Sequence, residues 1–98
     1  ITGGGLVENI IRVVPDGLGV AIDTGTWPRP ALFDWLQREG NVRDREMWRT
    51  FNCGIGFTLI VPAADADACI ARLATHELPA WRIGEVVSAT EAERVHIQ

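Results

Sequence analysis

The feature that most constrains the fold is an apolar run in the middle of the chain, Ile55 to Val61 (IGFTLIV). It follows the turn-forming Asn52-Cys53-Gly54 and ends at Pro62. Nearly continuous apolar character is typical of a strand that is covered on both faces of a sheet. We therefore expect Ile55 to Val61 to be a central β-strand, which requires neighbouring strands and covering helices.

Hydrophobic periodicity predicts the remaining elements. No internal repeat or linker divides the chain, so residues 1–98 are expected to form one unit. The order α-β-α-α-β-α-β-β predicts an α/β (α+β) fold, a partial mixed sheet of about four strands with helices packed on it. Helices are predicted over about 6–13, 30–39, 41–51 and 64–76, and further strands over 18–23, 81–87 and 94–97.

Three of the predicted helices carry details that a structure can test. Leu32, Phe33 and Leu36 are expected to form the buried stripe of the second helix. Asn41 is a good N-cap for the third helix. In the fourth, Ala66, Cys69, Ile70 and Leu73 recur at i, i+3, i+4 and i+7 and predict one apolar face.

Charge and composition exclude several classes of partner. Nine basic against 13 acidic residues give a net charge of -4, which is unlike the basic surfaces that bind nucleic acid or anionic membranes. All nine basic residues are arginine, so a Schiff-base lysine and the lysine of a Walker loop are excluded. Any phosphate would have to be bound by backbone amides or arginine. The absence of a long apolar run or signal segment favours a cytoplasmic protein.

No metal site and no catalytic residue is predicted. Cys53 and Cys69 lack the spacing of zinc ligands, and Cys53 is more typical of a small buried hydrophobe than of a nucleophile. Asp23 and Glu85 are strand carboxylates without a second acidic residue beside them, which disfavours magnesium binding. We expect the four tryptophans to pack in the interior rather than to stack on a base.

The first candidate binding feature is Thr2-Gly3-Gly4-Gly5, which leads into a helix and stands at the start of the chain. Glycines let the backbone approach a ligand, and free amides at a helix start favour an anion such as phosphate. A simple helix-entry turn is the alternative reading. Because such a turn usually connects a strand to a helix, we expect the chain to be part of a longer protein.

The second candidate feature is the turn Asn52-Cys53-Gly54-Ile55-Gly56. The amide of Asn52 could bind a ligand, and Gly54 and Gly56 would leave room for that ligand against the backbone. Alternatively, Asn52 caps the turn and the glycines relieve crowding, because both residue types are ordinary turn formers.

Four sequence blocks taken together resemble one family. The blocks are ITGGGLVENIIRVVPDGLG, WPRPALFDWLQREGNV, EMWRTFNCGIGFTLIVP and AWRIGEVV, in that order. They are similar to the closing third of phosphoribosylformylglycinamidine cyclo-ligase (AIR synthetase), over Ile1 to Val87. Ile11 stands where the family often has proline, and the histidine that usually precedes the ITGGG-like segment is not in this sequence. The resemblance implies part of a C-terminal domain, without the family's N-terminal domain.

The resemblance also implies a chemistry. The family uses ATP, with magnesium, to activate the formyl oxygen of formylglycinamidine ribonucleotide; an amidine nitrogen then closes the imidazole ring to give aminoimidazole ribonucleotide. The whole enzyme is expected to be a homodimer that binds most of its ATP and Mg²⁺ outside this stretch, and these 98 residues alone are expected to be inactive.

By position, the resemblance assigns binding roles and no general base. The residues expected to contact substrate or nucleotide phosphate are Thr2, Gly3, Gly4, Gly5, Glu8, Asn9, Asn52, Gly54 and Gly56. Two alternatives stay open: a stand-alone, ferredoxin-like regulatory module that binds a small molecule, and another member of the same superfamily. The blocks WPRPALFDWLQ and RTFNCGIG favour the cyclo-ligase.

Overall fold

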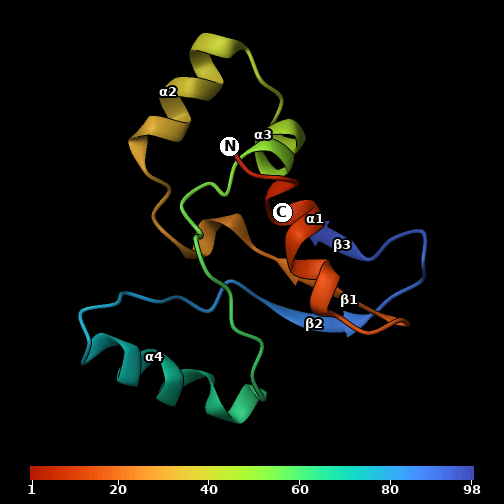
Figure 1. Cartoon of the computed structure of the whole chain (residues 1–98), viewed down its shortest axis with the longest axis vertical. Helices are drawn as coiled ribbons and strands as arrows, with labels where there is room; N and C mark the ends of the chain where they lie inside the picture. Colours follow the sequence, from red (N-terminus) through yellow and green to blue (C-terminus); the bar gives the residue numbers. More distant parts are fainter.

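The computed structural model describes all residues from 1 to 98 and has the α/β architecture that the sequence predicts (Figure 1). None of its helices has the length and apolar character needed to cross a bilayer. Its elements are α1 (Gly5–Asn9), η1 (Ile10–Val13), β1 (Leu18–Ile22), η2 (Thr24–Thr26), α2 (Ala31–Gly40), α3 (Asp44–Thr50), η3 (Ala63–Asp65), α4 (Ala66–Ala74), β2 (Gly84–Ser88) and β3 (Val95–Ile97).

The sheet has three strands in the order β2-β1-β3, with β1 in the centre. β1 pairs antiparallel with β2, from Leu18 opposite Ser88 to Ile22 opposite Gly84. It pairs parallel with β3, from Val20 opposite Val95 to Ile22 opposite Ile97. The sheet is therefore mixed, as predicted, but it is one strand smaller than predicted.

The missing strand is the segment Ile55 to Val61, and the prediction of a central strand there is wrong. These residues lie in an irregular connection, and Phe57 is 85% exposed. A strand needs a neighbour for its backbone groups, and neither edge strand of the sheet, β2 or β3, pairs with this segment. Nothing else in the chain pairs with this segment, so its apolar residues stay on the surface.

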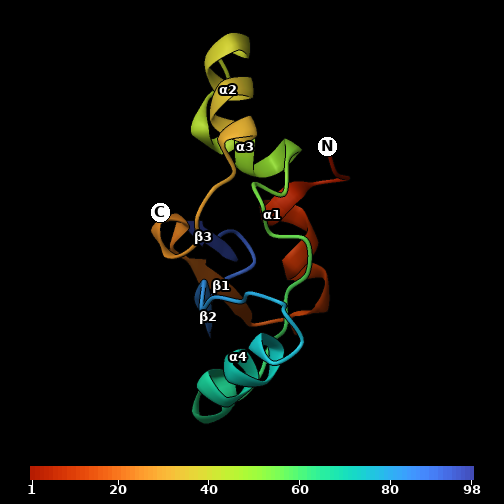
Figure 2. The same cartoon turned by 90° about the vertical axis from the view of Figure 1, so that its left-hand side faces the viewer.

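The core lies between β1 and the helical layer formed by α1 and α3. Val20 and Ile22 point to the same face of β1 and are buried, as are Leu6 of α1 and Met47 of α3. Figure 2 shows these layers from the side, with α2 and α4 at opposite ends of the molecule. Seven buried hydrophobic residues make up this core, and Trp27 is the one tryptophan among them.

The two outlying helices confirm part of the predicted packing. In α4 the residues Ala66, Cys69, Ile70 and Leu73 are the half-buried ones, so the predicted face is confirmed. In α2, Phe33 and Leu36 are half-buried, but Leu32 is 59% exposed and its predicted burial is wrong. Phe33 packs edge-to-face against Phe51, and this contact sets which side of α2 faces the body.

Asn41 ends α2 instead of beginning α3, which corrects the predicted cap. Its backbone is left-handed, with φ of 50°, and its amide donates to the carbonyl of Arg38. Asparagine tolerates this conformation better than most residues and commonly ends helices in this way. Arg43 takes the N-cap position of α3 without a side-chain hydrogen bond.

One arginine ties the end of the chain to the start of the sheet. Arg94, just before β3, donates three hydrogen bonds to backbone carbonyls: to Leu18 at 2.9 Å, Val14 at 2.7 Å and Pro15 at 3.0 Å. These bonds fix the loop between η1 and β1 and therefore the position of the helical layer on the sheet.

Candidate functional site

A surface groove of about 400 Å³ runs between α1 with η1 on one side and the segment after the Asn52 turn on the other. In Figure 2 that segment passes alongside α1 and continues towards α4. The groove is half apolar, and no charged residue lines it. Its lining residues are Thr2, Gly5, Leu6, Asn9, Ile10, Val13, Asn52, Ile55, Gly56, Phe57, Thr58 and Ile60.

The glycine turn at the start of the chain is held by local hydrogen bonds and close packing. The amide of Thr2 donates to the carbonyl of Thr50 at 2.8 Å, and the amide of Gly5 donates to Oγ1 of Thr2 at 2.6 Å. Gly4 and Gly5 have φ of 135° and 57°, and a Cβ on Gly5 would collide with the carbonyl oxygen of Trp48. The backbone therefore requires glycine at both positions.

Charged groups surround this turn, and sequence reasoning did not identify the two cations. Glu8 packs against Gly4, and its Oε1 lies 3.1 Å from Nε of Arg49. Arg12 donates from Nη2 to the carbonyl of Gly3 at 3.1 Å. The absence of lysine left backbone amides and arginine as the groups that could bind a phosphate, but only the fold shows that Arg12 and Arg49 lie beside the turn.

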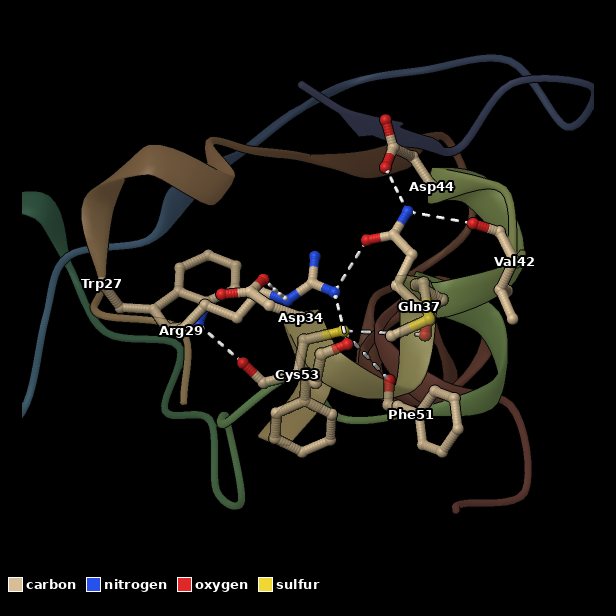
Figure 3. Close-up of polar contacts among 10 residues, drawn as sticks. Trp27, Arg29, Asp34, Gln37, Val42, Asp44, Phe51 and Cys53 are labelled. Carbon is tan, nitrogen blue, oxygen red and sulfur yellow. Dashed lines mark hydrogen bonds and ion pairs between the residues drawn. The ribbon is translucent and has the colours of Figure 1, made fainter. Parts of the chain in front are cut away.

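The second turn is fixed by contacts at each of its central residues. Oδ1 of Asn52 accepts from the amide of Gly54 at 2.8 Å, and Cys53 is left-handed with φ of 52°. Gly54 has φ of 101°, and a Cβ there would lie 2.6 Å from Cδ of Pro30. The buried indole of Trp27 donates from Nε1 to the carbonyl of Cys53 at 2.9 Å (Figure 3).

A polar network beside this turn connects Arg29, which precedes α2, with α2 and with the start of α3 (Figure 3). Nη2 of Arg29 donates to Oε1 of Gln37 at 2.9 Å, and Nε2 of Gln37 donates to Oδ1 of Asp44 at 2.7 Å. Nε of Arg29 is buried and lies 3.2 Å from Oδ1 of Asp34, an ion pair without hydrogen-bond geometry. Because α2 itself is only partly buried, this network orients it relative to the body of the domain.

Cys53 has the properties of a structural residue. It is 1% exposed, and its Sγ lies 3.6 Å from the carbonyl oxygen of Met47. Burial raises the pKa of the thiol above its ordinary 9.0, while the positive charge of Arg29 acts in the opposite direction. A buried thiol with a raised pKa is a poor nucleophile, because the thiolate is the reactive form.

The structure brings five of the nine predicted binding residues to one groove. Those five are Thr2, Gly5, Asn9, Asn52 and Gly56; Gly3, Gly4, Glu8 and Gly54 do not line it. Gly4, Gly5 and Gly54 have conformational or packing reasons to be glycine. Gly3 and Gly56 have none within this chain, because neither has a positive φ and a Cβ on either would meet nothing within 4 Å.

The residues present do not form a metal site. No group of three His, Cys, Asp or Glu side chains comes together anywhere in the chain. The groove offers a ligand apolar surface and the amide nitrogen of Asn52, which makes no hydrogen bond within the chain. Mg²⁺ does not fit this groove, because no carboxylate lines it.

The fold and groove together define a small mixed α/β domain whose two glycine turns meet at one surface groove. Comparison with known sequences identifies its family. Residues 1–97 match the family described as AIR synthase related protein, C-terminal domain, and the chain belongs to that family.

Individual relatives carry the name of one enzyme. The chain is 62% identical over 97 residues to "Phosphoribosylformylglycinamidine cyclo-ligase" of Xanthomonas oryzae pv. oryzae. The matched region covers 99% of this chain and 28% of the relative. The proteins of the same name from Xanthomonas campestris pv. campestris and Xylella fastidiosa are 60% and 54% identical over the same shares. The chain therefore spans about a quarter of the length of these relatives.

Proposed function

We propose that this chain is the C-terminal portion of a ligase that uses ATP to close the imidazole ring of formylglycinamidine ribonucleotide. Similarity to cyclo-ligases over 97 of its 98 residues is the observation that carries the proposal. In this proposal ATP and Mg²⁺ are bound mainly outside these residues, and the whole enzyme is a cytoplasmic homodimer. The 98 residues alone have no ring-closing activity.

The groove is the proposed contribution of this chain to ligand binding. Gly56 supports it, because it leaves open space at the groove wall that no side chain of the chain fills. The free amide nitrogen of Asn52 would donate to a ligand oxygen, while Arg12 and Arg49 supply positive charge near the first turn. Since the groove lining is uncharged, the proposed roles are binding and shaping and include no proton transfer.

The stand-alone regulatory module is less well supported. A self-sufficient module is expected to have few large apolar side chains on its surface. Here Phe57 is 85% exposed, Val13 is 75% exposed, and both line the groove. This exposure favours a domain that works with additional polypeptide.

A chimera tests the proposed function. The matched 97 residues of the Xanthomonas oryzae relative are replaced by this chain, and aminoimidazole ribonucleotide formation is measured with formylglycinamidine ribonucleotide, ATP and Mg²⁺. The chimera is expected to be active and the isolated chain inactive. Turnover by the isolated chain, or a folded chimera without turnover, would refute the proposal.

The same chimera tests the groove. Gly56→Val fills open space at the groove wall and is expected to raise the KM for a bound substrate by about tenfold or more, equivalent to about 1.4 kcal/mol. Gly25→Val is the matched control, since Gly25 lies in η2 and does not line the groove. Equal effects of the two variants would remove the groove from the proposal.

A further inference from the structure

The two glycine turns of the groove are joined through one short piece of backbone, the last turn of α3. The amide of Thr2 donates to the carbonyl of Thr50 at 2.8 Å, and Thr50 lies two residues before Asn52. Gly5 backs onto the same piece of chain, because a Cβ on it would collide with the carbonyl oxygen of Trp48. α1 therefore packs against α3, and the two helices lie next to each other in both views (Figures 1 and 2). The end of α3 thus sets the distance between the two turns.

The first of these turns, Thr2–Gly5, has little rigidity of its own. Gly3, Gly4 and Gly5 follow one another, and glycine has more backbone freedom than any other residue. No side chain caps the start of α1, and α1 is only five residues long. A helix of that length is not stable by itself. The position of the turn must therefore be maintained by contacts with the rest of the chain.

Glu8 makes one of these contacts. Its side chain covers Gly4, since a Cβ on Gly4 would lie 2.5 Å from Cβ of Glu8 and 2.8 Å from its Oε2. The Glu8 side chain is 45% exposed, so burial alone does not hold it there. Its Oε1 accepts a hydrogen bond from Nε of Arg49 at 3.1 Å, which forms an ion pair between α1 and the last turn of α3. Arg49 therefore holds the carboxylate that covers the turn.

Arg49 is placed to act on the groove without touching a ligand in it. It precedes Thr50, which accepts the amide of Thr2, and neither Arg49 nor Glu8 lines the groove. A site that is held in its binding conformation before the ligand arrives binds more tightly, because less ordering remains to be done.

We propose that Arg49 is a positioning residue. Through Glu8 it holds the Thr2–Gly5 turn at the distance from the Asn52 turn that a ligand of the groove requires. This inference rests on the proposed function, because it takes the ligand of the groove to be a substrate of the cyclo-ligase.

The chimera described above tests the effect on substrate binding. Loss of an exposed ion pair changes an equilibrium constant by about threefold. Arg49→Gln is therefore expected to raise the KM of one substrate, formylglycinamidine ribonucleotide or ATP, by about threefold and to leave kcat unchanged. That substrate is the one whose KM rises in Gly56→Val. Arg45→Gln is the matched control, because Arg45 is exposed on the same helix and makes no bond.

A double-mutant cycle tests whether Arg49 acts through Glu8. If it does, Arg49→Gln has no further effect once Glu8→Gln has removed its partner, and the double variant raises the KM by about threefold, like either single variant. Independent contacts of the two residues with the ligand would multiply to about ninefold. Circular dichroism verifies that each variant is folded.

Hydrogen exchange read by mass spectrometry measures the turn itself, independently of activity. The amides of Thr2 and Gly5 are both bonded in the folded turn. We expect them to exchange about threefold faster in the Arg49→Gln chimera than in the Arg45→Gln chimera. Amides of β1 that are bonded to β2 serve as the internal reference.

Three results would overturn the proposal. They are a KM that is the same in Arg49→Gln and Arg45→Gln, a ninefold effect in the double variant, and unchanged exchange at Thr2 and Gly5. An equal rise in the KM of both substrates, with a fall in kcat, would also overturn it and would show a general loss of structure. A folded chimera without activity refutes the proposed function instead, and the exchange measurement then still decides whether Arg49 holds the turn.

Discussion

Substituting alanine for Gly54 and, separately, for Gly56 tests the geometry of the second turn. Gly54 has φ of 101°, where a residue with a Cβ is strained by about 1–3 kcal/mol. The new Cβ would also lie 2.6 Å from Cδ of Pro30, and overpacking of this kind costs about 1–3 kcal/mol. Gly54→Ala is therefore expected to lower the free energy of unfolding by at least about 2 kcal/mol.

Gly56→Ala is the matched control, two residues away in the same turn. Its φ is not positive, and its Cβ would meet nothing within 4 Å, so we expect a change of about 0.5 kcal/mol or less. Urea unfolding followed by tryptophan fluorescence measures both variants. In thermal unfolding, the melting temperatures of the two variants should differ by about 6 °C or more, since 1 kcal/mol corresponds to about 4–8 °C in a domain of this size. Equal stabilities would refute the described turn.

Three further predictions concern contacts that hold the fold together. Trp27→Phe leaves the buried carbonyl of Cys53 without its donor and should cost about 1–3 kcal/mol in urea unfolding; an unchanged midpoint would contradict that bond. Arg94→Gln removes three bonds to backbone carbonyls and should cost about 1.5–3 kcal/mol, whereas Arg45→Gln, which breaks no bond, should cost about 0.5 kcal/mol or less. Because burial raises the pKa of the Cys53 thiol above 9.0, its contribution to stability is present below pH 9 and is lost as the pH rises further. The resulting fall in the unfolding midpoint should persist in Cys69→Ala and shrink in Cys53→Ala.

Local periodicity was sufficient to predict most of the fold. β1 and α4 lie where alternation and i, i+3, i+4 spacing placed them, because each has a face that the body covers at least in part. The helical segment from Gly5 to Val13 was predicted for the same reason, although its second half is a 3-10 helix.

The strand predicted over Ile55 to Val61 shows where such reasoning stops. Apolar composition indicates that a segment is suited to form a strand that is paired and covered. It does not show that the chain supplies the partner strand and the covering residues. Here neither edge strand of the sheet, β2 or β3, pairs with the segment. The misplaced cap at Asn41 has a different cause, since asparagine suits both ends of a helix and only the backbone conformation distinguishes them.

The candidate site was predictable in outline and not in detail. Glycine turns around Thr2 and Asn52 were identified from the sequence, and the structure brings both to one groove. The sequence did not indicate that close packing against Pro30 requires a glycine at position 54, or that Gly56 faces open space. Both facts depend on which distant residues the fold brings near each glycine. The positions of Arg12 and Arg49 beside the first turn are long-range features of the same kind.

The rate of aminoimidazole ribonucleotide formation by the chimera tests the central claim most directly. If this chain is the C-terminal portion of a cyclo-ligase, the chimera should work within about tenfold of the unmodified Xanthomonas oryzae protein, a loss of about 1.4 kcal/mol or less in transition-state stabilisation. A chimera that folds like the unmodified protein, and yet forms no product from formylglycinamidine ribonucleotide and ATP, would contradict it.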